Sequence, residues 1–156
     1  MMKRLMQTTN DLTLAILRIG LGVVIFPHGA QKLLGWFGGS GPGGTIGFFQ
    51  QTWGIPAIVT VLVIGAESLG ALALIAGFMS RVAAAGIAMV MLGAVTLVHW
   101  RVGFFMNWGG QLSGEGFEFH ILAIAMALAL FIGGGGALSV DRLLAARGRQ
   151  GVEAGR

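Results

Sequence analysis

Three histidines and the charged residues near them are the side chains whose types could do chemistry. His28 lies inside the first apolar stretch of the sequence, His99 ends the third, and His120 begins the fourth. An imidazole can donate or accept a hydrogen bond, ligate a metal ion or haem iron, or carry a proton. Together with Lys32 and Glu118, these residues are compatible with haem ligation, with a divalent metal site, or with a site that holds a quinone carbonyl or a small anion.

The spacing of these residues does not select one of those sites. Neither His-x-x-His nor Glu-x-x-His occurs in the sequence, and the chain has no cysteine. The lack of cysteine excludes Cys–zinc sites, iron–sulfur ligation by this chain and dithiol chemistry. We therefore predict no metal site and disfavour haem; the residues establish no cofactor, and a quinone is compatible with them. Polar residues that only stabilise the fold remain the open alternative.

Glu67 lies near the middle of the second apolar stretch. A charge at that depth costs about 2.5–3.5 kcal/mol on insertion scales, so it needs a partner. If the first two stretches form antiparallel helices, Arg18 falls roughly 9 Å to the inner side of Glu67. Its long side chain can cross that gap, so the sequence predicts a buried structural ion pair between Arg18 and Glu67. A functional Glu67, acting as a proton carrier or a ligand contact, is the alternative.

A second group of polar residues is expected at the outer boundary of the apolar stretches. We predict that these residues line a common cavity that holds a quinone headgroup or a small anion: His28, Lys32, His99, Glu118 and His120. Together with Glu67 they are the candidates for ligand binding or proton relay. The sequence identifies no catalytic residue.

Four apolar stretches must position these side chains. They span about residues 12–34, 55–78, 82–100 and 119–138, and each is near the ~20 residues that cross a bilayer as a helix. Only 10% of the 156 residues are charged and 55% are apolar, with a mean hydropathy of +0.82, whereas soluble domains carry about 25% charged residues. This composition excludes a disordered chain, a nucleic-acid-binding domain and most soluble enzymes. It predicts an all-α, integral membrane four-helix bundle that forms a single domain, residues 1–146.

The basic residues predict the orientation of this bundle. Seven of them fall in the segments expected on one side: Lys3, Arg4, Arg81, Arg142, Arg147, Arg149 and Arg156. The positive-inside rule makes that side cytoplasmic. We therefore expect both the N and C termini in the cytoplasm, and a multi-pass protein of a bacterial inner (plasma) membrane. Residues 147–156 are expected to form a basic, disordered tail.

The two loops expected on the other side are rich in aromatic residues. Residues 35–54 contain Trp36, Phe37, Phe48, Phe49 and Trp53 around a Gly-Pro-Gly-Gly turn at 41–44, and residues 101–117 contain Phe104, Phe105 and Trp108. Such residues fit the headgroup belt of a membrane. A lid over an outward-open cavity is the alternative interpretation.

Taken in order along the chain, several segments resemble the DoxX family, which includes DoxD-like small four-helix membrane proteins. Residues 17–32, with Arg18, His28-Gly29 and Lys32, resemble the opening pattern of the family, and Gly54-Ile55-Pro56 resembles the start of its second helix. Residues 65–70 and 77–81 resemble its glutamate-containing helix and the following turn, and residues 133–141 its Gly-rich Ser-x-Asp closing element. The resemblance covers about residues 10–145.

The resemblance implies a role near the quinone pool. The family is named for a subunit associated with a terminal quinol oxidase, and DoxD-type relatives belong to thiosulfate:quinone oxidoreductases. We expect a small inner-membrane subunit of a redox-linked complex, at most an oxidoreductase-associated subunit, that binds quinone or a small anionic metabolite between its helices. The expected partners are the lipid bilayer, a separate redox-protein subunit and further copies of the chain, with no nucleic acid. Two alternatives stay open: a non-enzymatic scaffolding protein, and a small proton-coupled transporter.

Overall fold

Apolar helices make up most of the protein. The computed structural model describes residues 5–153, and their side chains as far as residue 146. No strand occurs in that part of the chain, and three of its helices are long and apolar enough to cross a membrane: Leu12–Leu34, Ala57–Ala76 and Ser80–His99. The predicted all-helical membrane bundle is confirmed to this extent.

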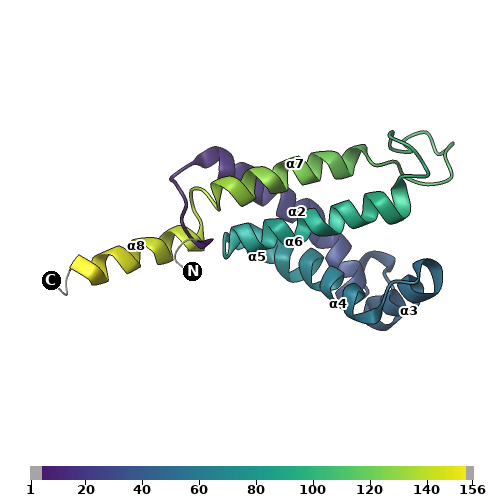
Figure 1. The fold of residues 1–156 in the computed structure, drawn as a ribbon, viewed down its shortest axis with the longest axis horizontal. Helices are drawn as coiled ribbons and strands as arrows, with labels where there is room; N and C mark the ends of the chain where they lie inside the picture. Colours follow the sequence, from purple (N-terminus) through teal and green to yellow (C-terminus); the bar gives the residue numbers. More distant parts are fainter. Residues whose placement is uncertain (1–4, 154–156) are drawn as a thin grey trace.

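The elements follow the order of the predicted apolar stretches. The first stretch forms α2 (Leu12–Leu34), and the second forms α4 (Ala57–Gly65), η2 (Ala66–Gly70) and α5 (Ala71–Ala76). The third forms α6 (Ser80–Ala94) and η3 (Val95–His99), and the fourth forms α7 (Glu118–Gly133). These helices lie side by side along the long axis of the molecule (Figure 1). At 16 residues, α7 is shorter than the ~20 residues that span a bilayer. The fourth span therefore stays a prediction.

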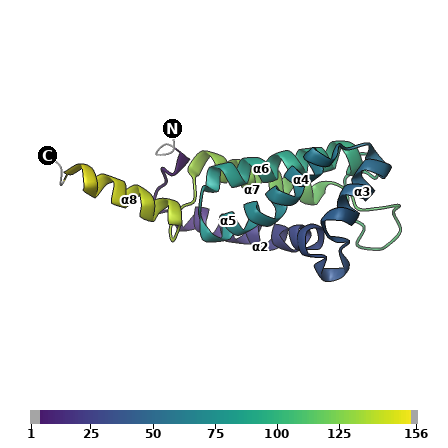
Figure 2. The same cartoon turned by 90° about the horizontal axis from the view of Figure 1, so that it is seen from below.

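Shorter elements lie at the two ends of this bundle. The 3-10 helix η1 (Trp36–Gly38) and helix α3 (Gly41–Trp53) lie at one end, and α8 (Val140–Glu153) extends from the other. Figure 2 shows the same arrangement from below. Residues 5–11 lie at the α8 end, because Ala137 N donates to Asp11 O at 2.8 Å. Residues 35–54 and 101–117 lie at the opposite end of the bundle (Figure 1).

The core is built from small and branched apolar side chains of the four stretches. Leu21 and Ile25 of α2, Leu74 of α5, Ile87 of α6 and Leu130 of α7 are fully buried. Large apolar side chains also cover the outside of the bundle, for example Ile16, Leu62, Met89, Leu122 and Ile132. A soluble bundle would leave polar residues there, so the exposed surface suits a lipid environment.

Two predicted helix ends shift because of local backbone chemistry. The second apolar helix begins at Ala57 and not at residue 55, since Pro56 is its extended N-cap, with φ −60° and ψ 145°. The fourth ends at Gly133 and not at residue 138. Gly134 and Gly136 adopt the left-handed φ values of +84° and +71° there, which a glycine tolerates and which end a helix.

Two further segments are helical where no helix was expected. The Gly-Pro-Gly-Gly sequence at 41–44 is the first turn of α3, because Pro42 lies where a helix needs no backbone N–H. Helix α8 covers residues 147–153 of the tail for which we predicted disorder. Residues 154–156 of that predicted tail lie outside the described part of the chain.

Candidate functional site

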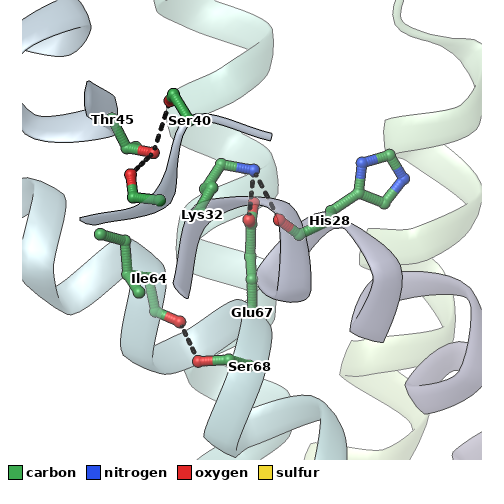
Figure 3. A network of polar contacts seen from close by, with 8 residues as sticks. His28, Lys32, Ser40, Thr45, Ile64, Glu67 and Ser68 are labelled. Atoms are coloured by element: carbon green, nitrogen blue, oxygen red, sulfur yellow. Dashed lines mark hydrogen bonds and ion pairs between the residues drawn. The ribbon is translucent and has the colours of Figure 1, made fainter. Parts of the chain in front are cut away.

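A buried ion pair joins the first two apolar helices near the end that carries α3. Lys32 Nζ in the last turn of α2 lies 2.5 Å from Glu67 Oε2 in η2, and the two side chains are 20% and 7% exposed. Lys32 also donates to the carbonyl oxygen of His28 at 3.3 Å (Figure 3). Each charge is the partner that the other requires at this depth.

Gly29 allows this ion pair to form. It is buried in α2, and a Cβ at this position would collide with the backbone of Glu67 and Ser68. Any larger residue would separate the two helices and pull Lys32 away from Glu67. The close approach of the helix backbones therefore positions the charges.

Glu67 also lies in an irregular part of its helix. Residues 66–70 form a π-helical segment, which takes an extra residue per turn and changes the face that its side chains present. Ser68, also buried, donates to Ile64 O at 2.5 Å within the same segment (Figure 3). Single-turn π segments inside α-helices are frequent at functional sites.

A pair of histidines lies at the same end of the bundle. His99, in the second π segment η3, and His120, at the start of α7, have ring centroids 4.2 Å apart and planes inclined by 40°. His99 Nδ1 donates to Glu115 O at 2.7 Å. Since a carbonyl only accepts, this bond places a proton on Nδ1 and leaves Nε2 as the acceptor of a neutral ring.

His120 is the least satisfied polar side chain of this pair. It is 93% buried, and its Nδ1 has no hydrogen-bond partner among the described residues. A buried polar atom without a partner costs about 1–3 kcal/mol. The His28 ring points away from the Lys32–Glu67 pair (Figure 3).

The two glutamates before His120 hold the neighbouring loop. Glu118 Oε1 accepts from Met106 N at 2.9 Å, and Glu115 Oε2 accepts from Asn107 N at 2.7 Å. Both carboxylates thus satisfy backbone N–H groups of residues 101–117. The geometry gives Glu118 a structural role, separate from the histidine pair.

The predicted ion pair between Arg18 and Glu67 is wrong. The guanidinium of Arg18 is buried, and it donates to the carbonyl oxygens of Leu74, Ile75, Gly135, Ala137 and Leu138 at 2.6–3.3 Å. These carbonyls belong to the last turn of α5 and to the turn after α7, where helix ends leave acceptors unsatisfied. The negative end of a helix dipole also favours a cation. Arg18 therefore closes the α8 end of the bundle, and Glu67 pairs with Lys32.

Asp141 completes this closure, and the chemical reasoning from sequence did not single it out. Its two carboxylate oxygens accept from Met79 N at 2.7 Å and Ser80 N at 2.9 Å, which caps the start of α6. Ser139 Oγ donates to Gly136 O at 2.8 Å in the same turn. The Ser-x-Asp spacing after a glycine run was the signal that could have identified it.

The predicted site residues fall into groups. Lys32, Glu67 and the His28 backbone form one group, and His99 and His120 form another. Their enclosure in one common cavity stays a prediction. Within the described residues, no group of three or more His, Asp or Glu side chains is arranged to hold a metal ion.

Comparisons with known proteins place this geometry in context. The family model described as DoxX matches residues 13–100, which include Lys32, Glu67 and His99 but not His120. The chain is 25% identical over 125 residues to the Bacillus subtilis (strain 168) protein named "Putative oxidoreductase CatD", a match that covers 80% of this chain and 83% of that protein. No solved structure matches the chain.

Proposed function

Because the chain belongs to the DoxX family, we propose that this membrane protein is a small subunit of a redox-linked complex. In this proposal it binds a quinone headgroup at the end of the bundle that carries the histidine pair. The oxidoreductase named among its relatives supports the redox link. Reduction of a quinone consumes two electrons and two protons, and the electrons come from a separate redox protein.

The buried, unpartnered Nδ1 of His120 is the observation that carries this proposal. A quinone carbonyl accepts a hydrogen bond, so an N–H at this position would gain the partner that it lacks. The neighbouring ring of His99, 4.2 Å away, offers a flat surface for the quinone ring. Phe119 packs edge-on against His120, with ring centroids 5.6 Å apart, and it suits an apolar ring.

Lys32 and Glu67 provide the charges of the proposed site. Their pair lies beside the backbone of His28, because Lys32 Nζ donates to His28 O and lies 2.5 Å from Glu67 Oε2. A proton passed from the Lys32 ammonium to the Glu67 carboxylate would convert the pair into two neutral groups, so this transfer leaves no lone charge. The pair thereby supports a route for the protons that quinone reduction requires.

Co-purified quinone tests the proposal. The protein is purified from membranes that contain quinone, and extracted lipid is analysed by mass spectrometry. His120→Phe keeps a ring of similar size but removes the donor, and we expect quinone per protein to fall about ten-fold. Thr96→Val, which removes an exposed hydroxyl of η3, is the matched control and should retain the quinone. Equal quinone content in wild type and His120→Phe would reject the site.

The proposal includes an orientation in the membrane. We propose that α7 is a fourth span, completed by its flanking residues, and that the α8 end faces the cytoplasm of a bacterial cell. The basic residues at that end support this orientation.

A scaffolding role is the second candidate, and the Arg18 closure favours it. Arg18 and Asp141 form hydrogen bonds with backbone groups at helix ends, which stabilises those ends. If the purified protein contains no quinone, these residues and the Lys32–Glu67 pair are sufficient to explain its polar interior as structure.

A further inference from the structure

A groove lies at the α8 end of the bundle, opposite to the end that carries the proposed quinone site. It has a volume of about 640 Å³ and is open to the outside. Its polar wall comes from the N-terminal segment and the start of α6, and includes Gln7, Thr9 and Arg81. Its apolar wall comes from α2 and α7, and includes Leu14, Ala129 and Ile132. One molecule that suits both walls has a polar head and an apolar chain.

Arg81 provides the charge in this groove. Its guanidinium donates to the carbonyl oxygens of Phe131 and Ile132 at the end of α7 and to Gln7 O. No carboxylate of the described side chains lies within 4.0 Å of it, and its Nε–H has no hydrogen-bond partner there. Arg81 is therefore a cation that lacks a counter-ion at the edge of an apolar surface.

The other polar groups of the groove are compatible with an anion. Gln7 and Thr9 are exposed and carry side-chain donors. Asp11 is the one carboxylate in the lining, and its Oδ1 accepts from Thr13 N at 2.8 Å as the N-cap of α2, where the positive end of the helix dipole offsets part of its charge.

The apolar wall continues onto the surface of the helices that faces lipid. Ile132 is 73% exposed, and Phe131 and Leu128 are also exposed on α7. The groove lies where α7 ends and α6 begins, which is the depth of the headgroups for a bundle that spans a bilayer. An acyl chain can follow α7 from this point into the membrane.

We propose that this groove binds an anionic phospholipid, with its phosphate beside Arg81 and Thr9 and an acyl chain along Leu14, Ala129 and Ile132. The phosphate supplies the counter-charge that Arg81 lacks, and the chain covers the apolar wall. The site is independent of the quinone proposal, since it shares no residue with the histidine pair or with the Lys32–Glu67 pair.

Native mass spectrometry of the full-length protein in detergent tests the site. Phosphatidylglycerol and phosphatidylcholine with the same acyl chains are added at equal concentration. We expect about five-fold more retained phosphatidylglycerol, the ratio expected for one basic residue and an anionic headgroup. Equal retention of the two lipids by wild type would overturn the proposal, as would complete displacement of phosphatidylglycerol by millimolar inorganic phosphate, which would indicate a site for a free anion.

Two variants and one control test the polar wall and the apolar wall of the groove separately. Arg81→Gln should abolish the preference for phosphatidylglycerol. Ala129→Trp leaves Arg81 unchanged but fills the apolar wall, so it should lower phosphatidylglycerol retention to the phosphatidylcholine level. Ala125→Trp places the same side chain one turn earlier on an exposed position of α7, and it should retain the lipid like wild type. If Ala129→Trp retains as much phosphatidylglycerol as Ala125→Trp, the groove is not the binding site.

Discussion

At the scale of single residues, the two basic side chains of α2 have distinct tasks. Arg18 binds five carbonyl oxygens at one end of the bundle, and Lys32 binds the Glu67 carboxylate at the other. The planar guanidinium has five donors in a fixed fork, so it suits several carbonyls at once, while a lysine ammonium suits a single carboxylate. The types of the two residues match the sites that they occupy.

A double-mutant cycle tests this assignment. Lys32→Met or Glu67→Gln leaves one member of a buried pair without its partner, and each should lower the free energy of unfolding by about 3–5 kcal/mol. The double variant should lose less than the sum of the two. Unfolding in mixed micelles is the measurement.

The same cycle with Arg18→Met in place of Lys32→Met is the control. Arg18 and Glu67 share no contact, so their effects should add to within about 0.5 kcal/mol. Strong coupling between Arg18 and Glu67, with none between Lys32 and Glu67, would contradict the observed pairing.

The sequence pointed to Arg18, Lys32 and Glu67, but it predicted Arg18 as the partner of Glu67 where the structure has Lys32. Depth along a straight helix correctly indicated that Glu67 needs a cation within reach. It could not show which face of each helix the side chains occupy, because the π segment at 66–70 shifts that face. It also assumed that Arg18 needs an anion, whereas carbonyl groups at helix ends satisfy it.

At the scale of elements, the contact between α2 and η2 depends on a glycine. Gly29→Ala places a methyl group against the backbone of Glu67 and Ser68, and it should destabilise the protein by about 1–3 kcal/mol through forced separation of the helices. Gly93→Ala is the matched control in α6, where nothing lies within 4 Å of the added methyl group.

Helix propensity determines whether the Gly93→Ala control gains or loses stability. Because alanine is a better helix former than glycine, Gly93→Ala should be neutral or stabilise by up to about 1 kcal/mol. Thermal unfolding of both variants is the measurement. A Gly29→Ala variant as stable as Gly93→Ala would show that the two helices are less closely packed than described.

The elements differ in how far sequence could predict them. The long apolar stretches predicted α2, the α4–α5 helix and the α6–η3 helix, because about 20 consecutive apolar residues are typical of a membrane-spanning helix. Helix α3 was missed, since a Gly-Pro-Gly-Gly sequence has the composition of a turn and only its packing against α2 and α4 makes it helical. The π segments could not be predicted, because the apolar sequence around them is nearly continuous and has no periodicity that an extra residue would interrupt.

At the scale of the whole molecule, the proposed orientation makes a prediction about accessibility. A green fluorescent protein fused after Arg156 should fluoresce, because that end is expected in the cytoplasm. Alkaline phosphatase inserted between Gly109 and Gly110, in the loop at the opposite end, should be active because that loop is expected outside.

The reciprocal fusions serve as controls for this topology. Alkaline phosphatase after Arg156 should be inactive, and green fluorescent protein at the loop position should be dark. Activity of both phosphatase fusions would place the two ends on the same side and would mean that α7 does not cross the membrane.

The closure around Arg18 also has a consequence for the order in which the ribosome delivers this chain. Two of its five acceptors lie 56 and 57 residues later in the sequence, and the other three lie 117 to 120 residues later. The first helix therefore leaves the ribosome with a guanidinium whose acceptors have not been translated. A nascent chain halted before Gly135 lacks three of them, and insertion of the first helix becomes fully favourable only when the closing turn arrives.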